Sequence, residues 1–319
     1  MSLGGLDVGT TVCRLIVFNE NGKILTSVYR EYPLITSKNW LEIDPERLWN
    51  SVCEVCREAA LKVGYDPIEA IAVSAMGDTL IVTDKIFNPV RNAILAFDNR
   101  SKEACDQLIN KYGNEKIFDM TGMPAHPMAT ATKIAWVFDN LKNGDKLIER
   151  FMCTEDFVIA KLTGNPVMSW STAARTMMFD SNLKQWWADM LHNLGLSEGM
   201  LSTVNSSAAI AGRISTSAAE NLGLSRDLLI VTAGHDQICS AIGSGAVKDG
   251  IVSDNTGTFE CVIAGVGDEK KESIDKSILG KYKLAFYPHG PMDLWAAFAW
   301  FNAGSIVNWC RDNLFTLEA

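Results

Sequence analysis

The chain has 319 residues, of which 47% are hydrophobic, so it can bury a sizeable core, and its length suggests about two domains. Its formal net charge of −9 at pH 7 argues against a protein that binds nucleic acid or a membrane surface. We find neither an apolar stretch long enough to cross a bilayer nor a basic leader before the first apolar segment, and the cysteines lie in mostly apolar surroundings. We therefore expect a cytoplasmic protein with reduced thiols.

The first 32 residues predict three strands of a β-meander. Apolar residues at 4–8, 12–18 and 24–32 have the pattern of strands, and Asn21-Gly22 between the second and third is a strong hairpin signal.

A helix is predicted between Asp44, which suits an N-cap, and Gly64, which suits a helix end. Its apolar residues recur with helical period and include Cys53 and Cys56. A single C-x-x-C can bind a metal or take part in redox chemistry, but no second ligand pair accompanies it. Packing in the core is therefore the favoured interpretation of both cysteines.

The first predicted strand runs directly into Asp7, Gly9, Thr10 and Thr11. Gly9 allows a tight turn, and the two hydroxyls with nearby N–H groups can then face a phosphate. Asp7 is suited to hold Mg²⁺, usually through water. The simpler interpretation is a turn aspartate after a strand.

The rest of the chain predicts further strands separated by helices. Strands are expected at 68–74 and 80–83, a mainly helical region over 101–201, and strands again at 210–214 and 228–232. Strands that alternate with helices in this way predict an α/β fold.

Asp236 follows the strand at 228–232, within a helix predicted over 233–245. A phosphate cradle and a lone carboxylate at the end of another strand are what the transfer of a phosphoryl group to a hydroxyl requires. From its position alone, Asp236 is as well explained as a helix N-cap.

A second segment, Asn255-Thr-Gly-Thr258, repeats the chemistry of the first cradle: a strand end, a glycine and hydroxyls. Two cradles, one in each half of the chain, suggest a duplicated architecture that holds phosphates between two lobes.

Several segments together resemble the FGGY family of carbohydrate kinases, which belongs with actin and Hsp70 in one superfamily. The most specific is the run from Met128 to Asn140, which contains Lys133 and Trp136 at the positions of a family-defining pattern. The other matching segments are Asp7–Thr11, Asn92–Arg100, Glu155–Phe157 with Leu162–Gly164, and Ser171–Arg175.

The resemblance implies an α/β fold of the actin-like ATPase (ribonuclease H-like) type. A first, sugar-binding lobe is expected at 3–245, and the start of a second, nucleotide-binding lobe at 246–319. Members of the family have a Gly-rich adenine-binding motif near the end of the second lobe, and we do not find that motif among the 319 residues.

The resemblance also implies roles for individual residues. Asp236 is expected to be the general base, Asp7 to anchor Mg²⁺, and Thr10, Thr11, Thr256, Gly257 and Thr258 to hold the phosphates of ATP. The positions expected to contact the sugar are Met76, Gly77, Asp78, Asp98, His126, Met128 and Gln237. Simpler interpretations remain for some of them: Asp78 and Asp98 as turn or surface residues, and His126 as a structural hydrogen-bond donor. Trp186 and Trp187 are expected to pack a helix.

The substrate is not specified by the resemblance. The segment from Thr121 to Met128 is closest to gluconate kinases, and the rest of the chain is similar to xylulokinases. However, Gly77-Asp78 stands where xylulokinases have a Met-His pair and glycerol kinases an Arg-Glu pair, and Ala96-Phe97 stands where many members have a tryptophan. Both positions face the sugar in the family. The expected activity is ATP- and Mg²⁺-dependent phosphorylation of a small sugar, polyol or sugar acid.

Two alternatives stay open. The chain is either a kinase or a truncated, non-catalytic sugar-binding fragment or regulator, while an actin-like assembly protein is disfavoured because it has no use for sugar-facing segments. The expected partner is a small molecule, with neither nucleic acid nor membrane, and homodimers are common in the family.

Overall fold

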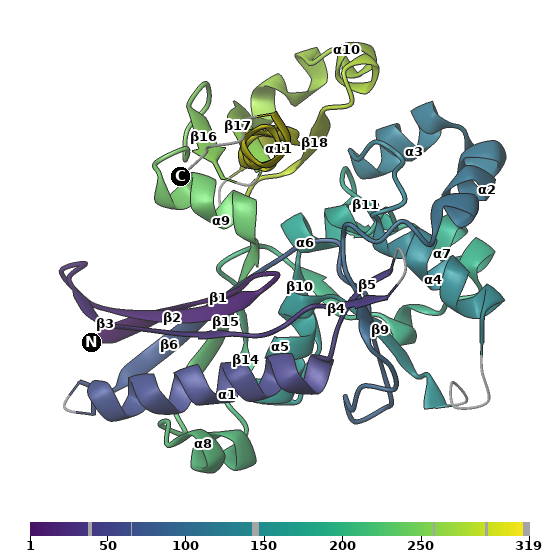
Figure 1. The fold of residues 1–319 in the computed structure, drawn as a ribbon. Coiled ribbons are helices and arrows are strands. Elements are labelled where there is room, and N and C mark those ends of the chain that lie inside the picture. The colour runs from purple at the N-terminus through teal and green to yellow at the C-terminus, as the bar shows by residue number, and fades with distance from the viewer. Residues whose placement is uncertain (38–39, 65, 142–146, 258, 291–292, 315–319) are drawn as a thin grey trace.

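Two β-sheets organise the molecule (Figure 1). The computed structural model describes residues 1–37, 40–64, 66–141, 147–257, 259–290 and 293–314. A six-stranded sheet belongs to the first three quarters of the chain, and a four-stranded sheet belongs to the last quarter. Within the described residues, we find no helix with the length and apolar character needed to cross a membrane.

The six-stranded sheet begins with the predicted meander, which is confirmed. Strands β1 (Ser2–Val8), β2 (Val12–Asn19) and β3 (Ile24–Glu31) pair antiparallel in sequence order. Buried and accessible residues alternate along β1, as expected for a strand with only one face against the core. This alternation fixes the register and therefore the position of Asp7 at the end of the strand.

The other half of the sheet contains the parallel strands. Strand β6 (Ile68–Ala75) lies between β1 and β15 (Leu229–His235) and runs parallel to both, and β14 (Ile210–Arg213) pairs antiparallel with the outer edge of β15. The carboxyl ends of β1, β6 and β15 therefore meet at one edge of the sheet. In open α/β sheets this edge is where ligands bind.

One expectation about β15 was wrong. The helix predicted over 233–245 begins only at Asp236, as α9 (Asp236–Gly243). The preceding residues continue β15 because they pair with β6 as far as His235 opposite Ala75. Asp236 is thus the first helical residue after the strand.

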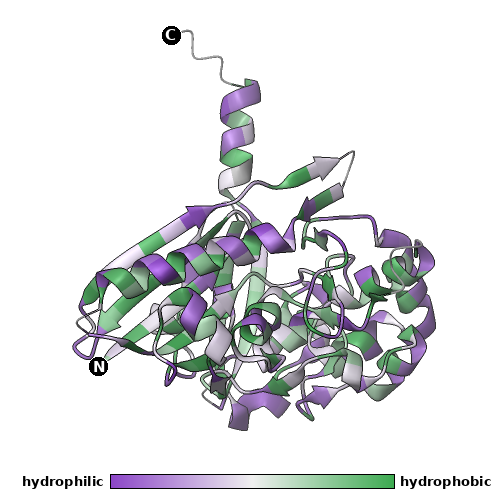
Figure 2. Ribbon diagram, turned by 90° about the horizontal axis from the view of Figure 1, so that it is seen from below, coloured by the Kyte–Doolittle hydropathy of each residue, from purple (hydrophilic) through white to green (hydrophobic). Residues whose placement is uncertain are grey.

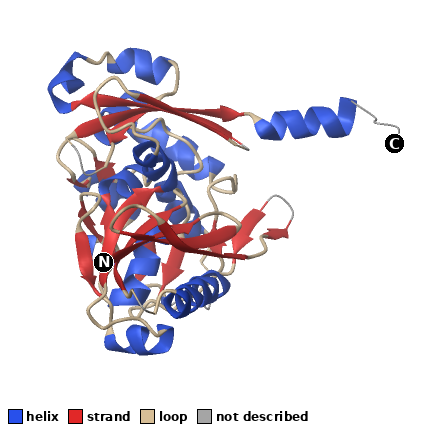
Figure 3. Ribbon diagram, turned by 90° about the vertical axis from the view of Figure 1, so that its left-hand side faces the viewer, coloured by secondary structure: helices blue, strands red, loops and turns tan. Residues whose placement is uncertain are grey.

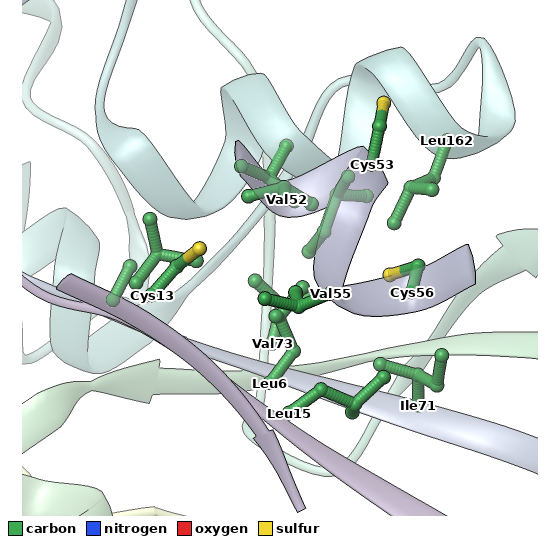
Figure 4. Packing of buried hydrophobic residues seen from close by; sticks show 14 of the residues in the cluster. Leu6, Cys13, Leu15, Val52, Cys53, Val55, Cys56, Ile71, Val73 and Leu162 are labelled. Atoms are coloured by element: carbon green, nitrogen blue, oxygen red, sulfur yellow. The ribbon is translucent and has the colours of Figure 1, made fainter. Parts of the chain in front are cut away.

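Helix α1 (Pro45–Lys62) covers one face of the sheet, as predicted, and its N-cap Asp44 accepts a hydrogen bond from the Glu46 amide. Cys53 and Cys56 are buried among side chains of the sheet and of α5 (Thr154–Thr163), including Leu6, Leu15, Ile71, Val73 and Leu162 (Figure 4). The interpretation of both cysteines as core residues is confirmed.

Cys53 and Cys56 are expected to resist alkylation in the native protein at pH 8, because burial raises the pKa of Cys53 to about 11 and that of Cys56 further. Cys310, which is only half-buried, serves as the reactive control. Peptide mass spectrometry after iodoacetamide treatment, with and without urea, checks this. Native labelling of Cys53 or Cys56 as fast as of Cys310 would contradict the buried environment.

A group of helices lies beside the sheet, on the right in Figure 1. It contains α2 (Lys102–Tyr112), α3 (Asn114–Thr121), α4 (Thr130–Asp139) and α7 (Ala188–Leu194). Trp186 and Trp187 are buried in its core, and Trp187 contacts the ring of Tyr112, which confirms their expected packing role. The region predicted to be mainly helical also contains short strands.

The remaining elements of the first three quarters are short. They are β4 (Ile35–Ser37), β5 (Trp40–Ile43), β7 (Ile81–Thr83), β8 (Ala93–Ile94), β9 (Arg150–Met152), β10 (Val167–Ser169), α6 (Trp170–Arg175), β11 (Phe179–Asp180), β12 (Gln185–Trp186), a 3₁₀ turn (Glu198–Met200), β13 (Thr203–Asn205) and α8 (Thr216–Leu222).

The four-stranded sheet is antiparallel, in the order β16-β17-β19-β18. Its elements are β16 (Val252–Thr256), β17 (Phe259–Gly267), a 3₁₀ turn (Asp268–Ser273), α10 (Lys276–Lys281), β18 (Ala285–Pro288) and β19 (Leu294–Asn302). Helix α9 connects the two sheets, and α11 (Gly304–Leu314) extends away from the rest of the molecule (Figures 2 and 3).

Candidate active site

The parallel strands bring Asp7 and Asp236 to the same edge of the sheet. Asp7 pairs with Ser74 of β6, and Gly234 pairs with the same Ser74 from the other side. Asp236 comes two residues after Gly234, just beyond the end of β15. Two segments more than 200 residues apart in the sequence, which were singled out for their carboxylates, are therefore neighbours in space.

The turn after β1 has the geometry of a tight loop. The Gly9 amide donates to the Val12 carbonyl at 2.9 Å, and the Tyr32 hydroxyl donates to the Gly9 carbonyl at 2.5 Å. These bonds fix the backbone that carries Thr10 and Thr11. Asp7 is accessible to solvent and accepts a hydrogen bond from Ser74 at 3.3 Å. Desolvation raises the pKa of Asp7, and the Ser74 hydrogen bond and Arg14 oppose that rise.

Asp236 has the chemical character of a base. Its pKa is raised to about 7, first by desolvation and then by the negative charge of Asp7. One carboxylate oxygen accepts a hydrogen bond from the Gln237 amide at 2.7 Å. The side chain is still 28% exposed, so a ligand can reach it. A carboxylate that titrates near neutrality is well matched to proton transfer.

A pocket of about 180 Å³ lies beside Asp236. This is smaller than the pockets that bind drug-sized ligands. The predicted residues that line it are Thr10, Met76, Gly77, Asp78, Met128, Asp236 and Gln237. The other lining residues are Thr79, Leu95, Ala96, Phe97, Arg175, His235, Phe259, Cys261, Phe298 and Trp300. The structure thus brings together half of the predicted site residues, seven of fourteen, from distant segments.

Asp98 is not part of the pocket wall. It is fully buried and accepts hydrogen bonds from the Leu41 amide at 2.6 Å and from the guanidinium of Arg100, which itself lies over the ring of Trp40. Because both carboxylate oxygens already have donors, this geometry does not support the expected contact between Asp98 and the sugar. The alternative interpretation of Asp98 as a surface residue does not hold either, since the side chain is buried. Its side chain connects the segment after Phe97 to the backbone of β5 at Leu41.

His126 also lies outside the pocket wall, and its side chain is exposed. Its Nδ1 accepts a hydrogen bond from the Met128 amide at 3.1 Å. The alternative of a structural hydrogen-bonding role fits this contact, although His126 is the acceptor in it and not the donor that was expected.

The second cradle lies at the end of β16. Thr256 and Gly257 are exposed, and the Gly257 amide donates to the Phe259 carbonyl at 2.9 Å in a tight turn. Neither residue lines the pocket, and Thr258 lies outside the described residues. Thr11 and Asp7 also lie outside the pocket wall. The phosphate-binding role of these residues stays a prediction.

Asp78 is held in an unusual conformation at the bottom of the pocket. Its φ of 60° is in the left-handed region, and Lys133, which is fully buried, donates to its carbonyl oxygen. Its side chain is 2% exposed, and Oδ2 accepts from Nε of Arg175 at 3.0 Å and from Nη2. Oδ1 is buried with no hydrogen-bond partner among the described residues.

Sequence reasoning missed Arg175 and His235 as parts of the site. Arg175 appeared only as one position in the segment Ser171–Arg175, and nothing in the sequence showed that its partner is Asp78, 97 residues earlier. The ring of His235 occupies the space beside Gly77, where a Cβ atom would lie 2.8 Å from His235 Cδ2. The signal available was the joint occurrence of a glycine at 77 and a histidine before Asp236.

His235 connects Asp236 to the second sheet. Its Nε2 lies 3.2 Å from Oδ1 of Asp236, and the hydroxyl of Tyr287 on β18 lies 3.4 Å from its Nδ1. Burial, followed by the charge of Arg175, lowers the pKa of His235 well below its usual range, so the ring is neutral. If Tyr287 donates to Nδ1, the ring proton is on Nε2, the ring nitrogen that lies 3.2 Å from Asp236.

The residues present fit a magnesium ion. Within the described part of the chain, no group of three or more His, Cys, Asp and Glu side chains could hold a metal on its own. Mg²⁺ does not need such a group, because one or two carboxylates with substrate phosphates and water suffice. The charge of Asp7 raises the pKa of Asp236, so a cation held by Asp7 would relieve the repulsion.

Comparison with known proteins identifies relatives along the whole chain. The FGGY family of carbohydrate kinases, N-terminal domain, matches residues 2–243. Glycerol kinase from Chromobacterium violaceum is 30% identical, over 97% of this chain and 62% of its own length. The ligand-bound xylulose kinase from Lactobacillus acidophilus is similar in structure, with a TM-score of 0.88 and 27% identity, over 98% of this chain and 63% of its own.

Gluconate kinase from the same organism has a TM-score of 0.89 and 26% identity, over 99% of this chain and 63% of its own. These similarities confirm the predicted actin-like α/β fold. The chain spans a little over three fifths of the relatives that it matches. The named relatives act on three different substrates, so they do not single out one branch. The domain division near residue 245 stays a prediction.

Proposed function

Because the chain belongs to the FGGY family of carbohydrate kinases, we propose that it binds a small polyhydroxylated substrate and takes part in transferring the γ-phosphate of ATP to one of its hydroxyls. The observation that carries this proposal is Asp236, a carboxylate with a pKa of about 7 that faces a small pocket and lies beside Asp7. A glycerol-, xylulose- or gluconate-like compound is the expected type of substrate.

In the proposed mechanism, Asp236 accepts the proton of the attacking hydroxyl. A substrate in the pocket would contact Asp236, Asp78 and Gln237, which all line it. Gln237 is itself oriented by Asn255, whose Nδ2 donates to Oε1 of Gln237 at 2.9 Å. Phosphoryl transfer depends mainly on positioning and charge neutralisation. The main contribution of these residues is therefore to hold the hydroxyl next to a base whose pKa is near neutral pH.

Asp7 would hold Mg²⁺ through its solvent-accessible carboxylate, and the ion would neutralise phosphate charge when bound. Thr10, Thr11, Thr256 and Gly257 are the proposed phosphate contacts, one pair from each half of the chain. We also propose the division into a sugar-binding lobe at 3–245 and a nucleotide-binding part at 246–319. Homodimerisation remains open to test by light scattering.

The experiment that tests this function is a substrate panel with the 319-residue chain. ADP release is measured with ATP and Mg²⁺ in the presence of glycerol, xylulose or gluconate, and phosphorylated products are identified by ³¹P NMR. Substrate-dependent release with a matching product supports a kinase. Binding of a substrate by calorimetry without release of ADP would favour the sugar-binding fragment or regulator. If the folded protein neither binds a substrate nor releases ADP with any of them, the proposal is contradicted.

Replacing His235 with alanine is expected to lower kcat/KM by roughly 10- to 100-fold, because it removes the polar ring whose Nε2 lies 3.2 Å from Oδ1 of Asp236. The acidic limb of the pH–rate profile should also move to higher pH, because loss of the Nε2 dipole beside Oδ1 disfavours the ionised form of Asp236. His235→Gln keeps an N–H donor and is expected to recover part of the activity. An unchanged pH profile in His235→Ala would show that His235 only fills space beside Gly77.

A further inference from the structure

We propose that this pocket selects neutral polyols and sugars and rejects sugar acids of the same chain length, with the Asp78–Arg175 pair as the determinant. This inference rests on the proposed function and narrows its substrate class. It comes from the charges of the pocket wall and from the hydrogen-bonding groups there that have no partner.

The pocket wall offers an acceptor that needs a donor. Oδ2 of Asp78 takes both nitrogens of Arg175, while Oδ1 is buried without a partner among the described residues. The neighbouring Thr79 is fully buried and lines the pocket, and its hydroxyl also has no partner there. Buried polar atoms are almost always satisfied in folded proteins, so these two atoms point to a ligand. The terminal hydroxyl of a neutral substrate can donate to Asp78, but the carboxylate that replaces it in the sugar acid cannot.

The positive charge of the wall is already neutralised. Arg175 is the arginine of the pocket lining, and its ion pair with Asp78 is 3% and 2% exposed. Other contacts of its guanidinium are Sδ of Met123 at 3.7 Å and the rings of Phe298 and Trp300 at 5.7 and 5.5 Å. A sugar acid would have to separate this buried pair in order to reach the guanidinium.

Among the described residues that line the pocket, no other side chain supplies a positive charge in place of Arg175. Lys133 is fully buried, directs its amine at the Asp78 carbonyl and does not line the pocket. His235, which does line it, is neutral because its pKa is lowered. A bound carboxylate would therefore face Asp78 and Asp236, and like charges brought together in a desolvated site oppose binding.

The remaining wall suits the carbon chain of a polyol. Phe97 and Phe259 stack at a centroid distance of 4.8 Å with their rings 6° from parallel, one from each half of the chain. Phe298 and Trp300 add two further aromatic faces. Apolar walls with a few convergent polar groups are typical of pockets for small ligands.

The test compares pairs of ligands that differ only in one terminal group: glycerol with glycerate, xylitol with xylonate, and glucitol with gluconate. Affinity for the full chain is measured by isothermal titration calorimetry in a buffer without polyols. In the pair that contains the most tightly bound ligand, the neutral member is expected to bind at least about tenfold more tightly than its acid. Equal or tighter binding of the acid in that pair would overturn the proposal, as would failure of all neutral members to bind folded protein.

Asp78→Asn provides a second comparison. The substitution frees the charge of Arg175, so the preference for the neutral member should shrink by at least about tenfold or reverse. Asp227→Asn removes an exposed carboxylate that also pairs with an arginine, and it should leave the preference unchanged. If Asp78→Asn does not fold, the wild-type pairs still decide. Phosphorylation of a sugar acid in preference to its neutral partner would refute this inference while leaving the proposed kinase function intact.

Discussion

Replacing Asp236 with asparagine is expected to reduce substrate-dependent ADP release at least about 100-fold, since a positioned base contributes roughly that much or more to proton transfer. The wild-type rate should rise with pH through about 7, where Asp236 loses its proton, and this limb should be absent from the variant. Asparagine has nearly the same shape, so its effect reports on the charge and not on packing. A residual rate within tenfold of wild type would exclude Asp236 as the base.

The same substitution is expected to stabilise the protein at pH 8. Asp236 has a pKa of about 7 in the folded chain against an ordinary value of 3.8, so the folded state binds the proton more tightly than the unfolded state does. Stability therefore falls as the pH rises from about 4 to about 7. The fall amounts to at most about 4 kcal/mol for a shift of this size.

Asparagine cannot ionise, so urea unfolding at pH 8 should show Asp236→Asn as the more stable protein, with a smaller difference at pH 5. Asp227→Asn, at an exposed ion pair, serves as the control and should change stability by less than about 1 kcal/mol. Equal stability of wild type and Asp236→Asn at both pH values would contradict the repulsive environment of Asp236. This measurement does not depend on catalytic activity.

The sequence predicted the site residues that lie at the ends of strands. Asp7 and Asp236 each follow an apolar strand, and the parallel pairing of β1, β6 and β15 brings such ends together. The first strand and the helical period of α1 come from local patterns, which is why they were predicted correctly. The resemblance to a family supplied the roles that local patterns left open.

Contacts between distant side chains could not be predicted in this way. Whether Asp78 faces a ligand or an arginine depends on where α6 places Arg175, and whether Asp98 is exposed depends on Arg100 and the backbone of Leu41. The stacking of Phe97 on Phe259 likewise depends on how the two sheets are placed. Such contacts are set by tertiary packing, which neither composition nor periodicity encodes.

Replacing Gly122 with alanine is expected to destabilise the protein by about 3 kcal/mol or more. Gly122 ends α3 with a φ of +69°, and a Cβ atom there would lie 1.8 Å from the Phe286 carbonyl oxygen on β18. The Phe286 amide also donates to the Gly122 carbonyl at 2.6 Å. Because both contacts are with backbone atoms, the clash can be relieved only by moving the two elements apart, and overpacking of this kind adds about 1–3 kcal/mol or more to backbone strain.

Gly195 offers a matched control for this prediction. It ends α7 with the same φ of +69°, but a Cβ atom there would have no neighbour within 4 Å. Gly195→Ala should therefore show only the left-handed strain of about 1–2 kcal/mol. Urea unfolding of both variants separates strain from clash, and equal losses would show that β18 does not pack against Gly122. Since Phe298 and Trp300 reach the pocket from the same sheet as Phe286, Gly122→Ala should also weaken polyol binding, whereas Gly195→Ala should not.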